Sequence, residues 1–156
     1  MGIRTTLYKM ANRVIKKSQS FLGFKTIGAR AIVLNEEGKI LLVKHTYQPH
    51  WFLPGGGVDR GETVKSALIR ELKEEVGLAV NEEEPVLFGV YYNTYMNVPD
   101  YPVIYVVKKY TEGAVYSGEI EDKGWFSYEA LHEMVSPGTK RRLDEYFGRT
   151  GQSQYW

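Results

Sequence analysis

Three glutamates, Glu71, Glu74 and Glu75, fall three and four residues apart in a segment whose apolar residues follow helical spacing. On a helix this spacing puts all three carboxylates on one face, where like charges repel. Lys73 lies on the opposite side, and Arg70 can reach Glu74, but one cation does not balance three anions. Such a cluster of oxygen anions is typical of a site for Mg²⁺, which shares its coordination with substrate phosphates. The alternative is a solvated acidic helix face.

The helix that must position these carboxylates is predicted over residues 62–76. Gly77 is expected to end it, since glycine favours the left-handed conformation that follows a helix. The glycine run 55–57 before it predicts a flexible loop whose exposed carbonyls could supply a further metal ligand. The apolar positions at three- and four-residue steps are Val64, Ala67, Leu68, Leu72 and Val76.

The remaining elements predict one mixed α/β or α+β domain, because strands interleave with helices. A polar, proline-bearing stretch over 93–102 is a candidate binding loop. The predicted strands are 26–34, 40–46, 86–92, 103–110 and 123–126, with a short apolar piece at 51–53. The later predicted helices are 127–134, capped by Ser127, and one from Ser136-Pro137 to Gly148.

The composition is that of an ordinary globular chain of 156 residues, with 43% hydrophobic and 25% charged residues. The chain has no cysteine, which excludes disulfides and thiolate metal sites. This composition suits a reducing compartment, so we expect a cytoplasmic protein. No apolar run approaches the roughly 20 residues that a membrane-spanning helix needs.

The charge is distributed unevenly along the chain. Residues 1–30 carry seven Lys or Arg and no Asp or Glu, whereas the rest carries an acidic excess. The apolar residues of the segment 3–22 follow helical spacing as far as Ile15, and the basic residues mostly lie between them. We therefore expect an amphipathic basic helix over 1–24, a catalytic domain over 25–150 and a tail over 151–156. The helix is expected to dock on the domain or a partner, or to make weak contact with an anionic membrane surface.

The whole pattern around the glutamates resembles the signature of the Nudix hydrolase family. Between residues 56 and 78 the sequence matches the Nudix box, G-x5-E-x7-R-E-U-x-E-E-x-G-U, without a departure. Each fixed residue type occurs at a frequency of about 5–10%, so a chance match in register is rare. The lead-in over 51–56 and the segment 125–127 also resemble the family, and the likeness extends over about residues 26–135.

The resemblance implies an α/β/α sandwich around a mixed sheet, with the box forming loop, helix and loop. It also implies Mg²⁺ as the cofactor, with Mn²⁺ as a possible substitute, and metal ligands at the positions Gly56, Glu71, Glu74 and Glu75. In the family the box arginine, Arg70 here, orients the glutamates, and Glu62 is a supporting residue. A late acidic residue often joins them, for which Glu119 and Glu121 are the candidates and Glu119 is preferred. The implied catalytic set is Glu62, Arg70, Glu71, Glu74, Glu75 and Glu119.

The substrate is less closely defined than the chemistry. Trp51, His50, Tyr92 and Tyr95 are candidate substrate contacts, although core packing explains most aromatic residues on strands. The resemblance implies hydrolysis of a pyrophosphate bond in a nucleoside diphosphate linked to another group. The alternatives are an RNA 5′-pyrophosphohydrolase and an inactive nucleotide-binding module. The acidic body gives no broad nucleic-acid footprint, and the oligomeric state is open.

Overall fold

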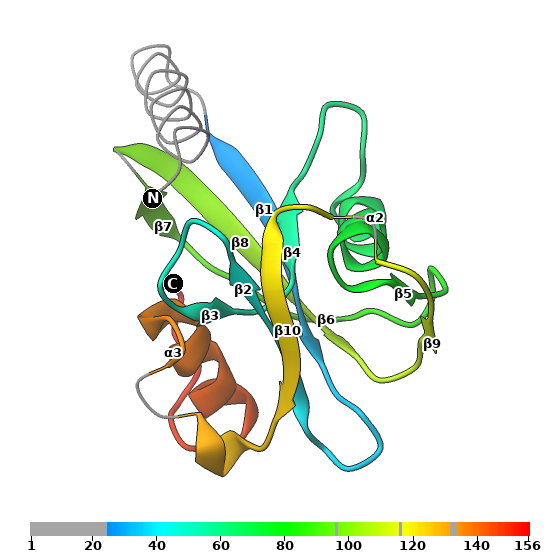
Figure 1. Ribbon diagram of the computed structural model, residues 1–156. Helices are drawn as coiled ribbons and strands as arrows, with labels where there is room; N and C mark the ends of the chain where they lie inside the picture. Colours follow the sequence, from blue (N-terminus) through cyan, green and yellow to red (C-terminus); the bar gives the residue numbers. More distant parts are fainter. Residues whose placement is uncertain (1–24, 96, 116, 132–133) are drawn as a thin grey trace.

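The computed structural model describes residues 25–95, 97–115, 117–131 and 134–156 (Figure 1). The amphipathic helix predicted over 1–24 lies outside the described residues. Within the described part, no helix is both long and apolar enough to cross a membrane.

In the part of the chain that the structure describes, two helices lie on either side of the strands. The strands are β1 (Thr26–Val33), β2 (Ile40–His45), β3 (Trp51–Phe52), β4 (Gly55–Gly57), β5 (Leu78–Ala79), β6 (Val86–Val90), β7 (Asn93–Tyr95), β8 (Val98–Val107), β9 (Thr111–Glu112) and β10 (Ile120–Phe126). The helices are α2 (Val64–Val76) and α3 (Pro137–Tyr146), with a short 3₁₀ turn η1 (Tyr128–Ala130).

The main sheet is mixed, as the sequence predicts for the fold. Its strand order is β4-β1-β8-β6, with β7 pairing to β8. Strands β1 and β8 are parallel, from Thr26 opposite Asp100 to Val33 opposite Val107, whereas β4, β6 and β7 pair antiparallel. A second sheet has the order β10-β2-β3. The parallel pair therefore holds β4, the strand that leads to α2, at one edge of the main sheet.

Helix α2 begins and ends at local signals in the sequence. Thr63 caps its start, because the Thr63 hydroxyl accepts a hydrogen bond from the Ser66 amide at 3.1 Å. Gly77 ends it in the left-handed conformation with φ 72°. The Lys123 ammonium, on β10, donates to the last-turn carbonyl of Val76 at 2.7 Å. These contacts satisfy backbone groups at the two ends of α2.

Two apolar cores lie on opposite faces of the main sheet, and β1 contributes to both because its side chains alternate. Ala29, Ala31 and Val33 pack toward α2, and Ile32 packs toward α3. Figure 1 shows the two helices on either side of the strands. The first core also contains Leu68, Leu72 and Val76 of α2, and the second contains Tyr91, Leu131 and Leu143.

The last described residues pack on the domain. The backbone of Tyr92 pairs with this segment, accepting a hydrogen bond from the Trp156 amide at 2.9 Å. The indole of Trp156 lies 5.4 Å from the fully buried guanidinium of Arg142, which also lies 3.9 Å from the Tyr91 ring. Arg142 also pairs with Glu145 at 2.6 Å. The segment thus covers a buried charge on α3.

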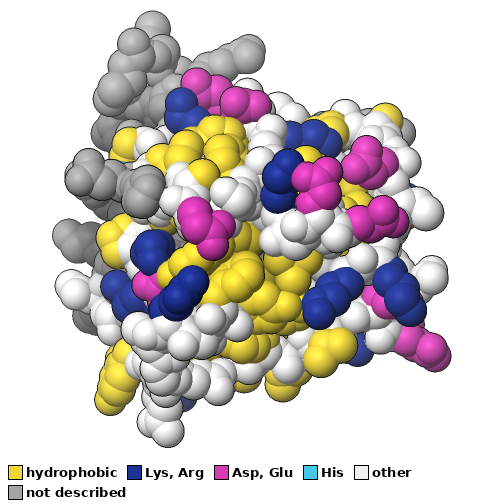
Figure 2. All heavy atoms as spheres, turned by 90° about the horizontal axis from the view of Figure 1, so that it is seen from below, with side chains coloured by type: hydrophobic (Ala, Val, Ile, Leu, Met, Phe, Trp, Pro, Cys, Tyr) yellow, Lys and Arg dark blue, Asp and Glu magenta, His cyan; other side chains and the backbone are white. Residues whose placement is uncertain are grey.

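One face of the molecule leaves apolar surface exposed. Seen from below, hydrophobic side chains gather in the middle of the face and charged side chains surround them (Figure 2). Among the described residues, β6 exposes Val86, Leu87 and Val90 at 65%, 56% and 54%, and it ends the path β4-β1-β8-β6. Burial in this fold is therefore concentrated between the helices and the sheet.

Three predictions about local structure are wrong. Residues 55–57 form strand β4 and not a flexible loop, because they pair with β1. The stretch 93–102 is largely the hairpin of β7 and β8, with Asn97 at φ 63° in its turn. The helix predicted over 127–134 is reduced to η1, and Ser127 makes no side-chain cap hydrogen bond. The final helix is confirmed, with Ser136 as its cap and Pro137 in its first turn.

Candidate active site

The carboxylate face of α2 opens onto a cavity of about 470 Å³. Its walls are Glu71, Glu74, Glu75, Ser117 and Glu119. The first three come from α2, and the other two come from the segment before β10. The fold therefore brings an acidic residue that lies more than 40 positions later in the sequence to the same cavity as the helix glutamates.

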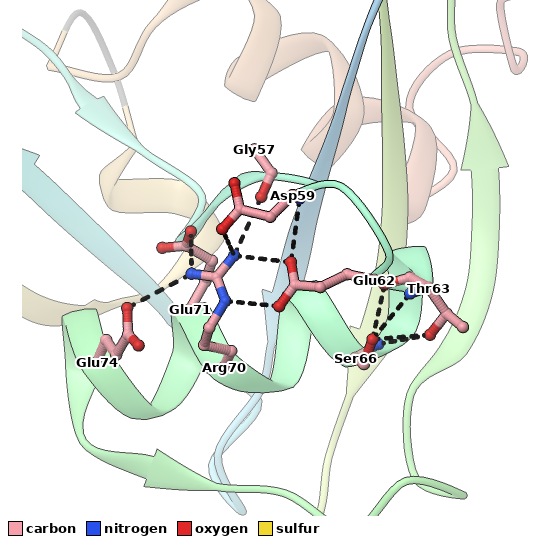
Figure 3. Close-up of polar contacts among 8 residues, drawn as sticks. All are labelled: Gly57, Asp59, Glu62, Thr63, Ser66, Arg70, Glu71 and Glu74. Carbon is pink, nitrogen blue, oxygen red and sulfur yellow. Dashed lines mark hydrogen bonds and ion pairs between the residues drawn. The ribbon is translucent and has the colours of Figure 1, made fainter.

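Arg70 holds the outer carboxylates in place (Figure 3). Its guanidinium donates to both oxygens of Glu62 at 2.8 and 3.0 Å, to Glu71 Oε1 at 2.8 Å and to Glu74 Oε2 at 3.4 Å. It also lies 3.6 Å from Asp59. The hydrogen bond from Arg70 is the main reason that the pKa of Glu62 falls to about 2. Arg70 thus fixes Glu62 in its charged form and is itself committed to carboxylates.

Glu75 lies deepest, with 7% of its surface exposed. Its Oε2 accepts a hydrogen bond from the Gly55 amide at 2.9 Å. Burial raises the pKa of Glu75 to about 7, and the Gly55 hydrogen bond and the charge of Arg30 oppose this rise. Glu71 and Glu119 raise the pKa further, since their negative charges are close. The charged form of Glu75 is therefore unfavourable at this buried position unless a cation lies beside it.

The glycine strand, β4 (Gly55–Gly57), passes close to these carboxylates. Gly55 has φ 131°, a backbone conformation that side chains disfavour, and a Cβ there would collide with the Ala29 carbonyl. A Cβ on Gly56 would collide with the Glu71 carboxylate. Glycine is thus required at position 55 for β4 to pass so close to β1, and the Gly56 backbone lies beside the Glu71 carboxylate.

The chemistry of this donor set fits a divalent cation. Carboxylate and carbonyl oxygens are the ligands that Mg²⁺ prefers, and the cavity has room for waters or phosphate oxygens beside them. Among the residues that the structure describes, no three His, Asp or Glu side chains are arranged closely enough to hold a metal ion together. Because Arg70 holds Glu71 and Glu74, a cation would have to compete with its guanidinium for these oxygens.

Of the two late acidic candidates, the structure places only Glu119 in the wall of the cavity. Glu121 lies beyond it on β10 and pairs with Lys44 at 3.3 Å. The backbone carbonyl of Glu119 accepts a hydrogen bond from the Thr46 amide at 3.1 Å, which ties this segment to the end of β2. The geometry therefore favours the residue preferred from the sequence.

The four candidate substrate contacts lie outside the cavity wall. Trp51 packs edge-on against Phe126 at 4.8 Å and is part of the second core, with His50 next to it in the chain. Tyr92 and Tyr95 are more open, at 39% and 40% exposed. Tyr92 contacts the rings of Tyr101 and Tyr155 edge-on at 5.7 and 6.1 Å. The two tyrosines are thus partly exposed to solvent, whereas Trp51 packs against the second core.

Several residues at or near the site are not among the site residues predicted from the sequence. Arg30 donates to the Gly55 carbonyl. In the sequence it is one of the seven basic residues of 1–30 and lies in the strand predicted over 26–34. Ser117 lines the cavity, and Asp59 joins the Arg70 network. His45 is buried with an unpaired Nδ1, and burial, followed by the charge of Arg30, lowers its pKa to about 4. Only Arg30 carried a signal, since it interrupts an otherwise apolar strand.

The fold and the carboxylate-lined cavity are typical of a hydrolase, and comparison with known proteins gives its family. Residues 24–146 match the NUDIX domain family. The chain belongs to this family and is a Nudix hydrolase, an enzyme that cleaves pyrophosphate bonds. Members of the family typically depend on a divalent metal ion.

Particular relatives extend the comparison beyond the box. The chain is 35% identical over 123 residues to the "Putative 8-oxo-dGTP diphosphatase" of Bacillus subtilis (strain 168), covering 78% of this chain and 79% of that protein. The crystal structure of a MutT NUDIX hydrolase from Burkholderia pseudomallei is similar with a TM-score of 0.68 and 29% identity, covering 78% of this chain and 97% of that one. An RNA pyrophosphohydrolase of Hydrogenovibrio crunogenus (strain DSM 25203 / XCL-2) is 53% identical over 47 residues, which is 30% of this chain and 28% of that protein.

Proposed function

We propose that the protein uses Mg²⁺ or Mn²⁺ to hydrolyse a pyrophosphate bond in a nucleoside diphosphate linked to another group. The observation that carries this proposal is the single cavity shared by Glu71, Glu74, Glu75 and Glu119. Together with the Gly56 carbonyl, these carboxylates would hold the cation. Four anions around one cavity are costly unless a cation is bound, and this supports a metal site over a solvated acidic face.

The protein's own residues have distinct roles in this proposal. A bound divalent ion would neutralise the pyrophosphate oxygens and lower the pKa of a coordinated water. Arg70 and Glu62 keep Glu71 and Glu74 oriented through their hydrogen bonds. One of Glu74, Glu75 and Glu119 accepts the proton from the attacking water. Tyr92 and Tyr95 offer exposed rings for the nucleoside base, and His50 and Trp51 are the further candidate contacts.

For the substrate, we propose a nucleoside triphosphate and place 8-oxo-dGTP first. The support is the Bacillus subtilis relative, because its similarity extends over most of both chains. The similarity to the RNA pyrophosphohydrolase covers less than a third of either chain. RNA with a 5′-triphosphate is therefore the second candidate substrate, and the experiment below includes it. The intact box glutamates weigh against an inactive nucleotide-binding module.

The test is a substrate panel with Mg²⁺, with Mn²⁺ and with EDTA. It should include 8-oxo-dGTP, dGTP, ADP-ribose, a dinucleoside polyphosphate and a 5′-triphosphate RNA. We expect hydrolysis of a nucleoside triphosphate with either metal and none in EDTA. Full activity in EDTA on metal-free protein would remove the proposed role of the carboxylates. Nucleotide binding without hydrolysis of any substrate would favour the binding module.

A further inference from the structure

Gly55 is held at both of its backbone polar groups. Its amide donates to Glu75 Oε2 at 2.9 Å, and its carbonyl accepts a hydrogen bond from the Arg30 guanidinium. Arg30 lies directly opposite Gly55 in the pairing of β1 with β4. Across the described part of the chain, no carboxylate forms an ion pair with Arg30, so this carbonyl is the partner that the structure gives it.

We propose that Arg30 is a positioning residue for the metal site, acting through the Gly55 backbone on Glu75 and on the Gly56 carbonyl. The inference rests on the proposed metal-dependent function. The carbonyl that Arg30 binds belongs to the peptide bond joining Gly55 to Gly56. Because peptide bonds are planar, fixing this carbonyl also fixes the start of Gly56.

The backbone at this point needs an external restraint. Gly55 adopts φ 131°, and glycine has more backbone freedom in the absence of contacts than any other residue. The strand β4 has three residues, so it supplies few hydrogen bonds of its own. The Arg30 hydrogen bond is made by a side chain from the strand that β4 pairs with, and it therefore holds the glycine strand in register beside Glu75.

The charge of Arg30 is also suited to this position. The positive charge of Arg30 stabilises the charged form of the buried Glu75. Arg70 instead pairs with the outer carboxylates of Glu62 and Glu71. His45 lies close enough to Arg30 for the two to interact, but it is buried and its lowered pKa keeps it neutral. Arg30 is therefore a cation beside the inner carboxylate that neither Arg70 nor His45 replaces.

Two variants separate charge from geometry. Arg30→Gln removes the charge and the guanidinium fork, while Arg30→Lys keeps the charge and loses the planar fork. Arg60→Gln, at an exposed arginine beyond the glycine strand, is the matched control. Two quantities are measured on folded protein, namely Mn²⁺ affinity by electron paramagnetic resonance and exchange of the Gly55 amide proton by NMR without metal. Global melting is recorded in parallel.

We expect Arg30→Gln to weaken Mn²⁺ binding about 10–100-fold, the range typical for residues that orient metal ligands. Gly55 amide exchange should accelerate in the same variant. Arg30→Lys should recover only part of both effects, and Arg60→Gln should match wild type. Because Arg30→Gln could lower global stability, Arg30→Lys provides the same two readouts in a milder change.

The inference is overturned if both Arg30 variants bind Mn²⁺ and protect the Gly55 amide as wild type does. It is also overturned if only the melting temperature falls, because a purely structural role predicts that result. Failure of the proposed function looks different, since wild type would then neither bind Mn²⁺ nor hydrolyse any substrate. The exchange of the Gly55 amide would still test the restraint in that case.

Discussion

Replacing Glu75 with glutamine isolates the effect of one buried charge. The Glu75 carboxylate is 7% exposed, and its Oε2 accepts the Gly55 amide hydrogen bond at 2.9 Å. Glutamine has the same size and keeps a carbonyl oxygen for that bond. Glu75→Gln should therefore preserve the packing of α2 against β4 and remove only the negative charge.

The size of the effect follows from the pKa of Glu75. Burial raises this pKa from 4.5 to about 7 in the metal-free protein. The difference corresponds to at most about 3 kcal/mol of unfolding free energy, at about 1.4 kcal/mol for each tenfold change. In the unfolded chain the Glu75 carboxyl loses its proton near pH 4.5, whereas in the folded protein it keeps the proton until about pH 7. The folded protein therefore loses stability as the pH rises from 4.5 to 7, and the full cost is present above pH 7.

Glu75→Gln should therefore melt higher than wild type when metal is absent and the pH is above 7. For a chain of this size, about 3 kcal/mol corresponds to an increase of up to about 6–12 °C. The gap should shrink as the pH falls, because wild-type Glu75 then becomes neutral as well. Added Mg²⁺ should stabilise wild type more than the variant, since only wild type keeps the full set of carboxylates. Turnover should fall at least about a hundredfold.

The assay is thermal unfolding in EDTA and in Mg²⁺ across this pH range, with turnover measured on the same preparations. Glu83→Gln, an exposed glutamate in the turn before β6, is the matched control and should change neither quantity. A melting gap that does not vary with pH would refute the assignment of the cost to Glu75 ionisation. A folded Glu75→Gln enzyme with a near wild-type rate would remove Glu75 from the metal site.

Three further predictions test other parts of the molecule. Arg70→Lys should reduce turnover and Mn²⁺ affinity about 10–100-fold, because lysine cannot bridge Glu62, Glu71 and Glu74 together, and unchanged affinity would contradict the role of Arg70. A variant lacking residues 1–22 should fold and keep most of its turnover if the basic leader is accessory, and an insoluble or inactive product would make it part of the core or the site. Trp156→Ala should lower the unfolding free energy by about 2–4 kcal/mol in urea titrations, because it uncovers Arg142 and leaves a cavity beside Gly138. A loss below about 0.5 kcal/mol would show that the last segment is not a stabilising contact.

The box helix could be predicted from the sequence because its signals are local. Apolar spacing gives its face and Gly77 ends it, whereas its start was predicted at Glu62, and the structure begins it at Val64 after the cap formed by Thr63 and Ser66. The same spacing places three carboxylates together without any knowledge of the rest of the fold. The mixed sheet was also predictable in kind, since strands and helices alternate along the chain.

The errors arose where distant residues decide the structure. The glycine run is a strand only because β1 lies beside it, and no local pattern encodes that partner. The hairpin over 93–102 was obscured by Pro99 and Pro102, which are tolerated where a strand does not need their amides. Arg30 was counted as part of a charge excess, and its contact with Gly55 depends on the β1–β4 register. Burial of Glu75 likewise requires the assembled sheet.

The parallel pairing of β1 with β8 joins residues 74 positions apart, as Thr26 and Asp100 show, and the glycine strand and α2 both lie within this span. Closing so long a segment costs chain entropy before any contact forms, so such pairings tend to form slowly during folding. A short peptide containing the box carries all its glutamates but lacks β1, which fixes Gly55 and Gly56. Metal-binding ability should therefore emerge as a late property of the folding chain, arising only when two distant strands meet.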